Sequence, residues 1–459
     1  MKKIMFLYHV KEREYGIISM IEQQIKEIMP HIEIDNGRFH SSIWKTVQFM
    51  PDIIVSIPPR DANASNYLTV LKIITGAIVI SMNTEGYYYF TPESIQDIIG
   101  YNKYAEELVD YFIVWGQKTK KMLGAYLLKD KKVSDIRRVK VTGYAWYETD
   151  LAIKNYKSNE LYYTIQEWCA KFNMTILAIT GFMLADISIN DYQELGYFGN
   201  DIPLDERTLS EIDQAKESIE AEGEFRKKYI DRIIFLAEAN PDKGIIVKLH
   251  PIEINKKNTC YDILTKYPNV WLIKEQVPIG LILKNVECMI HYNSTCNLEA
   301  YIYKVPTIQL YDDSKLTSFK MVWQLKSDST YLVDIHDLHE LDKIVKSGMQ
   351  FKSLRSVEKL LFELFNWKEG SDYKPVEKSA YIISHANKKQ HLKFSDPKIL
   401  KAINSEQGKF IKRKLVDVVW EKFGTIEMCR SASKLFKIYI YVIIGKFFRK
   451  CKFLNFRRK

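Results

Sequence analysis

The chain has 459 residues, of which 46% are hydrophobic and 27% are charged, and its formal net charge is +10. This composition excludes a largely disordered chain, and the length exceeds one ordinary hydrophobic core, so we expect two domains and an extension. The six cysteines are scattered without the spacing of a zinc site or a disulfide framework, which fits a reducing compartment.

Two features of the sequence bear on localisation. The apolar run at the N-terminus is interrupted by charged residues from Lys11 to Glu14, too early for the core of a signal peptide. No apolar stretch reaches the roughly 18 residues that a membrane-spanning helix needs. We therefore expect a cytoplasmic protein that is not integral to the membrane.

The positive charge is concentrated at the C-terminus. From residue 430 onward the sequence has ten basic residues and no acidic one, interleaved with aromatic and aliphatic residues, and the rest of the chain is formally neutral. This pattern argues against a nucleic-acid partner and is typical of a tail that binds the anionic inner face of the plasma membrane. The alternative is a C-terminal helix that packs on the core and has a solvated basic end.

In the first third of the chain, short apolar runs alternate with helical patterns. A helix is expected over residues 17–28, and a lysine-rich helix after residue 115. Short apolar runs between helices indicate buried parallel strands in βαβ units. The runs of four to six residues are 4–8, 53–57, 77–81, 111–115 and 139–142, and a longer stretch over 67–74 lies among them.

The alternation of strands and helices restarts after residue 160. Two α/β domains in series that face a cleft form the GT-B architecture. We therefore predict a Rossmann-like acceptor domain over 1–160, a Rossmann-like donor domain over 161–340 and a helical extension over 341–459. In the second domain, helices are expected over 162–172, 209–239, 279–284 and 295–303, and strands over 175–179, 244–249, 270–273, 286–290 and 307–310.

A first candidate motif, KLHP, begins at Lys248 and lies where the strand 244–249 ends. Ligands bind beyond the carboxyl ends of strands in open α/β sheets, so Lys248 and His250 are well placed to meet a nucleotide phosphate. Pro251 ends the strand and fixes the turn. The alternative is that His250 is an ordinary loop histidine.

A second motif, HYNSTCNLEA, occupies residues 291–300. Asn293 or Ser294 can cap the helix that follows, which leaves other amide groups of its first turn for an anion. Ser294 and Thr295 are therefore candidates for a phosphate-binding site, and Glu299, one turn later, for hydrogen bonds with sugar or ribose hydroxyls. The alternative is that Ser294 and Thr295 only cap the helix.

The two motifs together, KLHP followed by HYNSTCNLEAYIYKVPTIQL, resemble the donor-binding half of bacterial polysaccharide glycosyltransferases of the GT-B fold. The most similar family is that of surface carbohydrate biosynthesis proteins. Capsular Kdo transferases, polysialyltransferases and CDP-glycerol glycerophosphotransferases also have an HP motif followed by a Ser/Thr motif. The resemblance covers most of residues 1–315 and implies a nucleotide-sugar donor, with a CMP-linked acidic sugar such as Kdo as the first expectation, and a surface-polysaccharide or lipid-linked glycan acceptor.

The first domain contains the residues that are expected to act on the acceptor. Glu85, in the segment NTEG after a strand, is the candidate general base, and its alternative is a surface loop residue. His9 and Arg13, after the first strand, are candidates for binding the acceptor or a donor carboxylate. Two residues depart from the family pattern. Tyr87 replaces a glycine, and Lys248 replaces an arginine, which keeps the charge but removes bidentate phosphate recognition.

The sequence has no Asp-x-Asp pair to hold a divalent metal against a diphosphate, and no GxGxxG, Walker A or GxSxG motif. We therefore expect metal-independent glycosyl transfer without a cofactor, in which Lys248, His250 and the helix N-terminus at Ser294 neutralise the leaving nucleotide. Two alternatives remain. One is a UDP-sugar 2-epimerase, which has the same fold, and the other is a noncatalytic protein of a polysaccharide-assembly complex.

Overall fold

A computed structural model describes most of the chain, which divides into two compact units. Unit 1 consists of Met1–Glu148 with Leu360–Lys459, and unit 2 of Thr149–Lys359. The predicted division at residues 160 and 340 stays a prediction. Glu85, Thr295 and the basic tail lie outside the described residues, which are 1–9, 11–59, 62–83, 108–128, 133–157, 159–194, 204–255, 260–292, 294, 296–312, 330–353, 355–387, 404–406, 408–410 and 413–414.

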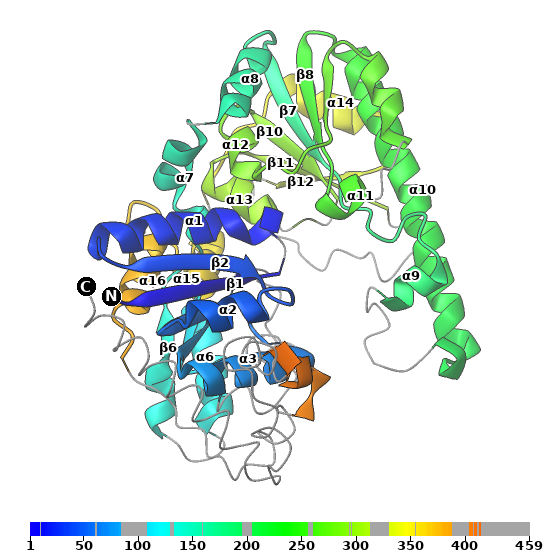
Figure 1. Ribbon diagram of the computed structural model, residues 1–459. Helices are drawn as coiled ribbons and strands as arrows, with labels where there is room; N and C mark the ends of the chain where they lie inside the picture. Colours follow the sequence, from blue (N-terminus) through cyan, green and yellow to red (C-terminus); the bar gives the residue numbers. More distant parts are fainter. Residues whose placement is uncertain are drawn as a thin grey trace, which may run out of the picture. The chain divides into compact units, whose positions relative to one another are not determined.

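Unit 1 contains a six-stranded parallel sheet in the order β2-β1-β3-β4-β5-β6 (Figure 1). The central strands β3 and β4 are buried along their whole length, as expected for parallel strands that helices cover on both faces. The strands are β1 (Lys3–Tyr8), β2 (Glu33–Arg38), β3 (Ile53–Ser56), β4 (Ile78–Met82), β5 (Tyr111–Val114) and β6 (Val139–Val141).

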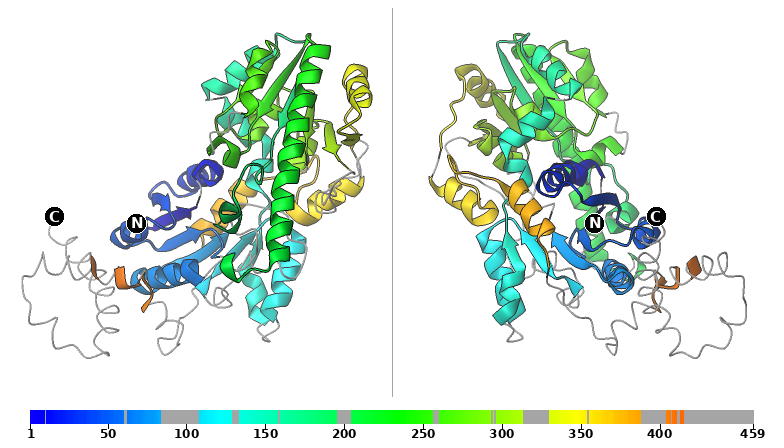
Figure 2. Two further views of the ribbon diagram at one scale, coloured as in Figure 1. Left: turned by 90° about the vertical axis from the view of Figure 1, so that its right-hand side faces the viewer. Right: turned by 60° about the vertical axis from the view of Figure 1, so that its left-hand side comes forward.

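Helices cover both faces of this sheet. On one face, α2 (Ile43–Phe49), α3 (Ala62–Thr75) and α6 (Gln117–Leu128) contribute to the main hydrophobic core of unit 1. On the other face, α1 (Lys11–Ile28) packs against α16 (Pro375–Ser384), although the two are far apart in the sequence (Figure 2). Short 3-10 helices are η2 (Val133–Arg138) and η3 (Ala145–Tyr147).

Aromatic residues connect the C-terminal part of unit 1, from Leu360 onward, to its N-terminal part. The ring of Phe365, at the end of α15 (Arg355–Phe365), stacks on Trp115 with 5.7 Å between the centroids. The hydroxyl of Tyr373 accepts the backbone N–H of Tyr144 at 2.7 Å. Gly143 has φ +102°, and a Cβ there would lie 2.6 Å from the Tyr373 hydroxyl, so both the backbone conformation and this contact require glycine.

Unit 2 contains a second six-stranded parallel sheet in the order β12-β11-β10-β7-β8-β9. Counted from the first strand of the unit, this is the 3-2-1-4-5-6 order of dinucleotide-binding domains. The strands are β7 (Met174–Ile179), β8 (Lys243–Lys248), β9 (Val270–Ile273), β10 (Cys288–His291), β11 (Thr307–Tyr311) and β12 (Thr330–Asp334).

The long helix α10 (Leu209–Ala239) covers one face of this sheet together with α14 (Leu338–Ser347) and η5 (Cys260–Lys266) (Figure 1). Its start is fixed by a capping box between Thr208 and Glu211. The other face is covered by α8 (Glu160–Cys169), α12 (Ile279–Leu283) and α13 (Cys296–Ile302). The remaining helices are α7 (Thr149–Tyr156), α9 (Ile189–Glu194), η4 (Leu204–Glu206) and α11 (Pro251–Asn255). The predicted fold class, two Rossmann-like domains of the GT-B type, is confirmed.

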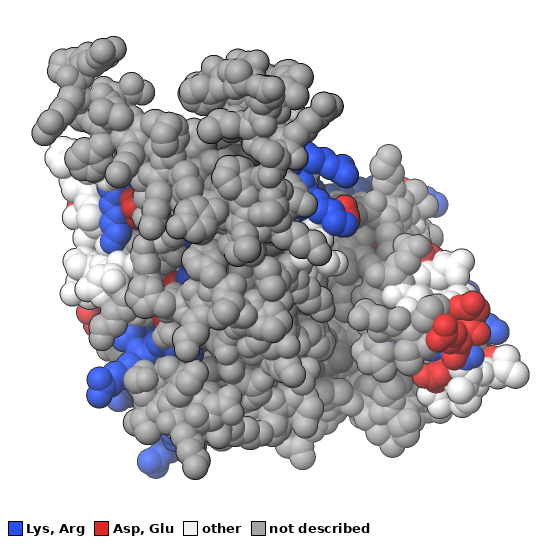
Figure 3. Space-filling view, turned by 60° about the horizontal axis from the view of Figure 1, so that its bottom comes forward, with Lys and Arg blue, Asp and Glu red and all other residues white. Residues whose placement is uncertain are grey.

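Charged side chains of both signs lie on the described surface. Both basic side chains (Lys or Arg) and acidic side chains (Asp or Glu) occur on the described part of the face drawn in Figure 3. Within the described ranges, every helix is too short or too polar to span a bilayer.

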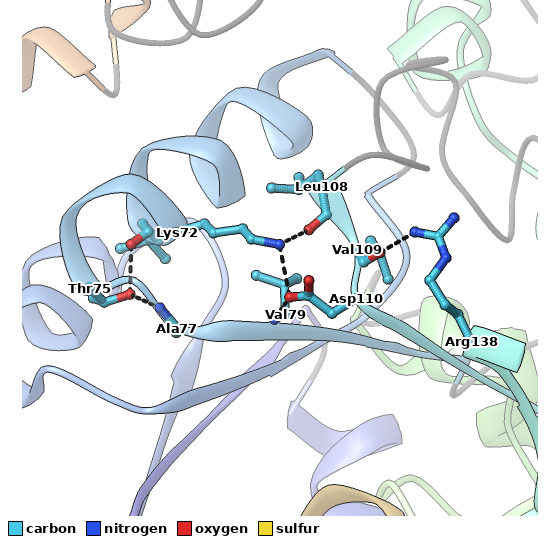
Figure 4. Close-up of polar contacts among 9 residues, drawn as sticks. Lys72, Thr75, Ala77, Val79, Leu108, Val109, Asp110 and Arg138 are labelled. Atoms are coloured by element: carbon cyan, nitrogen blue, oxygen red, sulfur yellow. Dashed lines mark hydrogen bonds and ion pairs between the residues drawn. The ribbon is translucent and has the colours of Figure 1, made fainter. Parts of the chain in front are cut away.

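A buried ion pair connects α3 to the amino end of β5 (Figure 4). Lys72 donates to the carboxylate of Asp110 at 2.8 Å and to the carbonyl of Leu108 at 2.6 Å, and Asp110 also accepts the backbone N–H of Val79 at 2.7 Å. Close by, Arg138 donates to a backbone carbonyl at 2.8 Å. Removing one partner of such a pair leaves the other charge buried, which typically costs about 3–5 kcal/mol. This network is therefore structural.

Candidate functional site

In each unit, one pair of neighbouring strands marks the point where the strand order reverses. The pair is β7 and β10 in unit 2, and β1 and β3 in unit 1. Ligands of open α/β sheets bind in the crevice beyond the carboxyl ends of such a pair. In unit 2 these ends are followed by Thr180 and by the segment that contains Ser294, and in unit 1 β1 is followed by His9. Among the sequence candidates, Ser294 and Glu299 therefore follow a strand of the unit 2 switch point, and His9 follows a strand of the unit 1 switch point. Lys248 and His250 lie at the end of the neighbouring strand β8 and in the loop after it.

Lys248 and Glu299 form the charged part of the unit 2 site. Lys248 is the last residue of β8, which pairs with β7, and Val247 before it packs into the core under α10. Because side chains alternate along a strand, Lys248 faces the side of the sheet that α13 covers, and α13 carries Glu299. Burial lowers the pKa of Lys248, although the charge of Glu299 opposes this. Burial raises the pKa of Glu299 to about 7, although the charge of Lys248 opposes this. Near neutral pH, the Glu299 carboxyl group can therefore both donate and accept a hydrogen bond.

Ser294 lies two residues before the first residue of α13 and contacts its backbone. Its hydroxyl accepts the backbone N–H of Cys296 at 3.3 Å, and its own N–H donates to Nδ1 of His291 at 3.4 Å. Burial raises the pKa of the Cys296 thiol to about 11. The charge of Glu299 acts in the same direction, and the hydrogen bond with Ser294 and the charge of Lys248 oppose it. The side chain of Ser294 therefore satisfies the first backbone N–H of α13, and the predicted cap by Asn293 or Ser294 stays a prediction. Thr295 lies outside the described residues, so its phosphate-binding role stays a prediction.

His291 is a buried histidine whose sequence position alone did not reveal a role. Burial lowers its pKa to about 4, so the ring is neutral near pH 7. The backbone N–H of Ser294 contacts Nδ1 of this ring. His291 therefore holds the loop that leads into α13.

His250 directly precedes the short helix α11 (Pro251–Asn255) and lies two residues after Lys248. Its carbonyl accepts the N–H groups of Glu253 at 2.9 Å and Ile254 at 3.1 Å. Nδ1 of its ring accepts the backbone N–H of Ile252 at 3.3 Å. In the neutral form of the ring, this contact favours the tautomer with the proton on Nε2, which is then a hydrogen-bond donor.

Open space lies directly beyond the end of β7. Among the residues that the structure describes, a Cβ added to Gly181 would meet no atom within 4 Å. This glycine follows Thr180 at the switch point between β7 and β10. A ligand group can therefore approach the backbone here, beside the loops that contain His250 and Ser294.

In unit 1, His9 lies at the carboxyl end of β1. Its ring stacks on that of His40 with 5.0 Å between the centroids and meets the ring of Phe39 edge-on at 5.2 Å. Its backbone N–H donates to the buried carboxylate of Glu14 at 2.7 Å. Arg13 lies in α1, but its side chain is outside the described part of the chain. The acceptor-binding roles of His9 and Arg13 stay predictions.

The structure thus brings Lys248, His250, Ser294 and Glu299 to the carboxyl edge of one sheet, whereas His9 belongs to the sheet of unit 1. Glu85, the candidate base, follows β4 but lies outside the described residues. In the described ranges, no group of three or more His, Cys, Asp or Glu side chains is arranged to hold a metal ion.

Comparison with solved structures gives similarities over most of the chain at low sequence identity. The UDP-GlcNAc 2-epimerase of Methanocaldococcus jannaschii, solved in complex with UDP-GlcNAc and UDP, is 16% identical, with a TM-score of 0.48 over 84% of this chain and 100% of the epimerase. The wall teichoic acid polymerase TagF is 12% identical, with a TM-score of 0.49 over 83% of this chain and 87% of the TagF chain. Anabaena HepE, solved with UDP and glucose, is 10% identical, with a TM-score of 0.38 over 91% of this chain and 100% of HepE.

No family model matches the sequence, and no curated protein matches it. The similar structures include transferases and epimerases, and at these identities and scores they do not assign an activity to this chain.

Proposed function

We propose that the protein transfers a sugar from a nucleotide-activated donor to a surface polysaccharide or a lipid-linked glycan, without a metal ion. The observation that carries this proposal is the placement of Lys248, His250 and Ser294 at the carboxyl ends of neighbouring strands of the unit 2 sheet, with Glu299 in the helix α13 that follows. A partly buried lysine at the carboxyl edge of a dinucleotide-type sheet is suited to an anionic ligand, and a carboxyl group beside it to a ligand with hydroxyls. A nucleotide sugar combines both chemical features.

Each residue has a defined role in this proposal. Lys248 supplies positive charge to the nucleotide phosphate, His250 donates a hydrogen bond from Nε2, and Ser294 with Thr295 binds phosphate at the start of α13. Glu299 binds sugar or ribose hydroxyls. Positive charge and fixed donors stabilise the negative charge that develops on a leaving nucleotide. On the acceptor side, His9 and Arg13 bind the glycan and Glu85 removes a proton from its hydroxyl. A CMP-linked acidic sugar as donor rests on the motif resemblance alone.

A nucleotide should raise the melting temperature of the protein without added metal. A ligand that binds only the folded state stabilises it by about 2.7 kcal/mol at a concentration of 100 times its Kd. Thermal shifts with CMP, UDP, GDP and CDP, each measured with and without EDTA, test this. We expect one nucleotide to give a shift that EDTA leaves unchanged. Strict dependence of the shift on Mg²⁺ or Mn²⁺ contradicts the metal-independent mechanism.

An assay of UDP release, together with the thermal shifts, separates the two alternative functions. Release of free UDP from a UDP-sugar in the absence of an acceptor identifies a 2-epimerase. Failure to bind any of the four nucleotides points to a noncatalytic assembly protein.

The C-terminal tail should hold the protein on an anionic membrane surface. Each of its ten cations contributes about 1 kcal/mol near such a surface, and its aromatic residues add apolar contact. Truncation at residue 430 should move the protein from the membrane fraction to the supernatant and leave nucleotide binding intact. Sedimentation with anionic liposomes at low salt measures this. If the full chain does not sediment, the tail is a packing element instead.

A further inference from the structure

Glu253 is a buried acidic residue with no role in the site so far. It lies in α11, three residues after His250, and only 1% of its surface is exposed. A buried carboxylate is costly unless donors satisfy it, so its partners show what it does.

The carboxylate of Glu253 has three donors. Oε2 accepts the hydroxyl of Thr180, and Oε1 accepts the hydroxyl of Tyr261. The backbone N–H of His250 also points at Oε2, at 3.4 Å. These donors come from the end of β7, from η5 and from the end of β8, so one side chain connects three segments at the carboxyl edge of the sheet.

Thr180 transmits the effect of Glu253 to His250. The hydroxyl oxygen of Thr180 accepts the backbone N–H of His250 at 3.0 Å. Because the hydroxyl proton of Thr180 is donated to Glu253, a lone pair of the same oxygen faces His250. Thr180 therefore keeps this orientation only while Glu253 accepts its proton.

The same contacts determine which ring nitrogen of His250 has the proton. They fix the backbone at the start of α11, where the N–H of Ile252 meets Nδ1 of the ring. That contact keeps Nδ1 an acceptor and puts the proton on Nε2. Without these contacts, the backbone at the start of α11 could move, and the Ile252 N–H would no longer hold Nδ1 of His250 as an acceptor.

We propose that Glu253 is a positioning residue of the ligand site. Through Thr180 it holds His250 so that the Nε2–H group is presented to the ligand. The identity of that ligand, a nucleotide phosphate, rests on the proposed function.

A double-mutant cycle tests whether Glu253 acts through His250. Glu253→Gln should weaken binding of the nucleotide that gives the largest thermal shift by about tenfold or more, the usual value of a hydrogen bond to phosphate. On the His250→Ala background, Glu253→Gln should cause no further loss, because the residue through which it acts is absent. Additive losses, measured by calorimetry, contradict the proposal.

Thr180 provides a pair of variants that does not alter the buried carboxylate. Thr180→Val removes the hydroxyl and should lose affinity like Glu253→Gln. Thr180→Ser keeps the hydroxyl and should retain the parental affinity. This pair tests the proposal even if Glu253→Gln does not fold. Equal affinity of the Val and Ser variants overturns it.

Two acidic residues away from the site serve as controls. The carboxylate of Glu287 accepts the N–H of Thr175 at 2.6 Å, at the amino end of the same strand β7. Asp110 is a buried carboxylate in unit 1. Glu287→Gln and Asp110→Asn should leave affinity unchanged, whatever they do to stability. A comparable loss of affinity in either control shows that the effect of Glu253→Gln is general destabilisation.

A measurement without ligand separates this proposal from the proposed function. Long-range ¹H–¹⁵N NMR of histidine-labelled protein identifies the ring nitrogen that has the proton, with His250→Ala for assignment. We expect the Nε2–H form of His250 in the parent and in Thr180→Ser, and a mixture of forms in Glu253→Gln and Thr180→Val. If no nucleotide binds the parent, the proposed function fails, but the NMR result still decides the role of Glu253. An unchanged Nε2–H form in both variants refutes it.

Discussion

Glu85→Gln protein should bind nucleotide with the parental affinity and transfer sugar about a hundredfold more slowly, the usual contribution of a positioned general base. Glu85 follows β4, and the carbonyl of Asn83 at the end of that strand accepts the indole N–H of Trp115 at 2.7 Å, which fixes the start of the segment. Glutamine is similar in size but cannot take up the proton. Calorimetry measures nucleotide affinity, and incorporation of labelled sugar into glycan of a membrane fraction measures transfer.

His250→Ala is the matched contrast to Glu85→Gln. It should weaken nucleotide affinity about 10- to 150-fold, because a hydrogen bond to a charged phosphate is worth about 1.5–3 kcal/mol. The two variants should therefore fail in different assays. Parental transfer by Glu85→Gln excludes Glu85 as the base and makes His9 the next residue to test. Parental affinity of His250→Ala means that the donor-site assignment is wrong.

The buried strands were predictable because their residues are apolar on both faces. The apolar runs at 53–57 and 270–273 correspond to β3 (Ile53–Ser56) and β9 (Val270–Ile273), and the helix expected over 209–239 is α10 (Leu209–Ala239). By contrast, β2 (Glu33–Arg38) was missed, since its sequence EIDNGR has little apolar character. As an edge strand it pairs with β1 alone and is only partly buried, so composition gives no signal for it.

The site was predictable where a motif coincides with a strand end. Lys248 and Ser294 were found because a cation or a small hydroxyl residue follows an apolar run. Glu253 was missed because its role depends on Thr180 and Tyr261, which are 73 and eight residues away in the sequence. The only sign of Glu253 in the sequence was its position, since it is an acidic residue three positions after His250 in a short turn. The switch points were also not predictable, because strand order in the sheet cannot be derived from the order of strands in the chain.

Glu299→Gln protein should become more stable relative to the parent as the pH rises from about 4.5 to 8, by about 3 kcal/mol in total. Burial raises the pKa of Glu299 from its ordinary value of 4.5 to about 7. Between these values the folded protein keeps a proton that the unfolded chain has lost. The contribution of Glu299 is therefore fully present below pH 4.5 and is lost as the pH rises through 7. Glutamine has no proton to lose, so its contribution is constant.

The difference between the two proteins isolates Glu299 from other buried groups. His291 acts in the opposite direction, because burial lowers its pKa from 6.5 to about 4 and stability is lost as the pH falls through this range. That contribution is common to both proteins and cancels. Urea unfolding of each protein across the pH range measures the difference. A difference that stays constant with pH means that Glu299 titrates at its ordinary value in the folded protein.

Lys248→Met extends the same test to the pair. The charge of Lys248 opposes the rise in the pKa of Glu299, so its removal should raise that pKa further. In Lys248→Met protein, the stability that depends on Glu299 should then be lost at a higher pH than in the parent. The Lys248→Met, Glu299→Gln double variant is the reference for this measurement. Lys284→Met, at an exposed lysine of the same unit, is the control and should not move it. If Lys248→Met leaves the pH range unchanged, the charge of Lys248 does not influence the titration of Glu299.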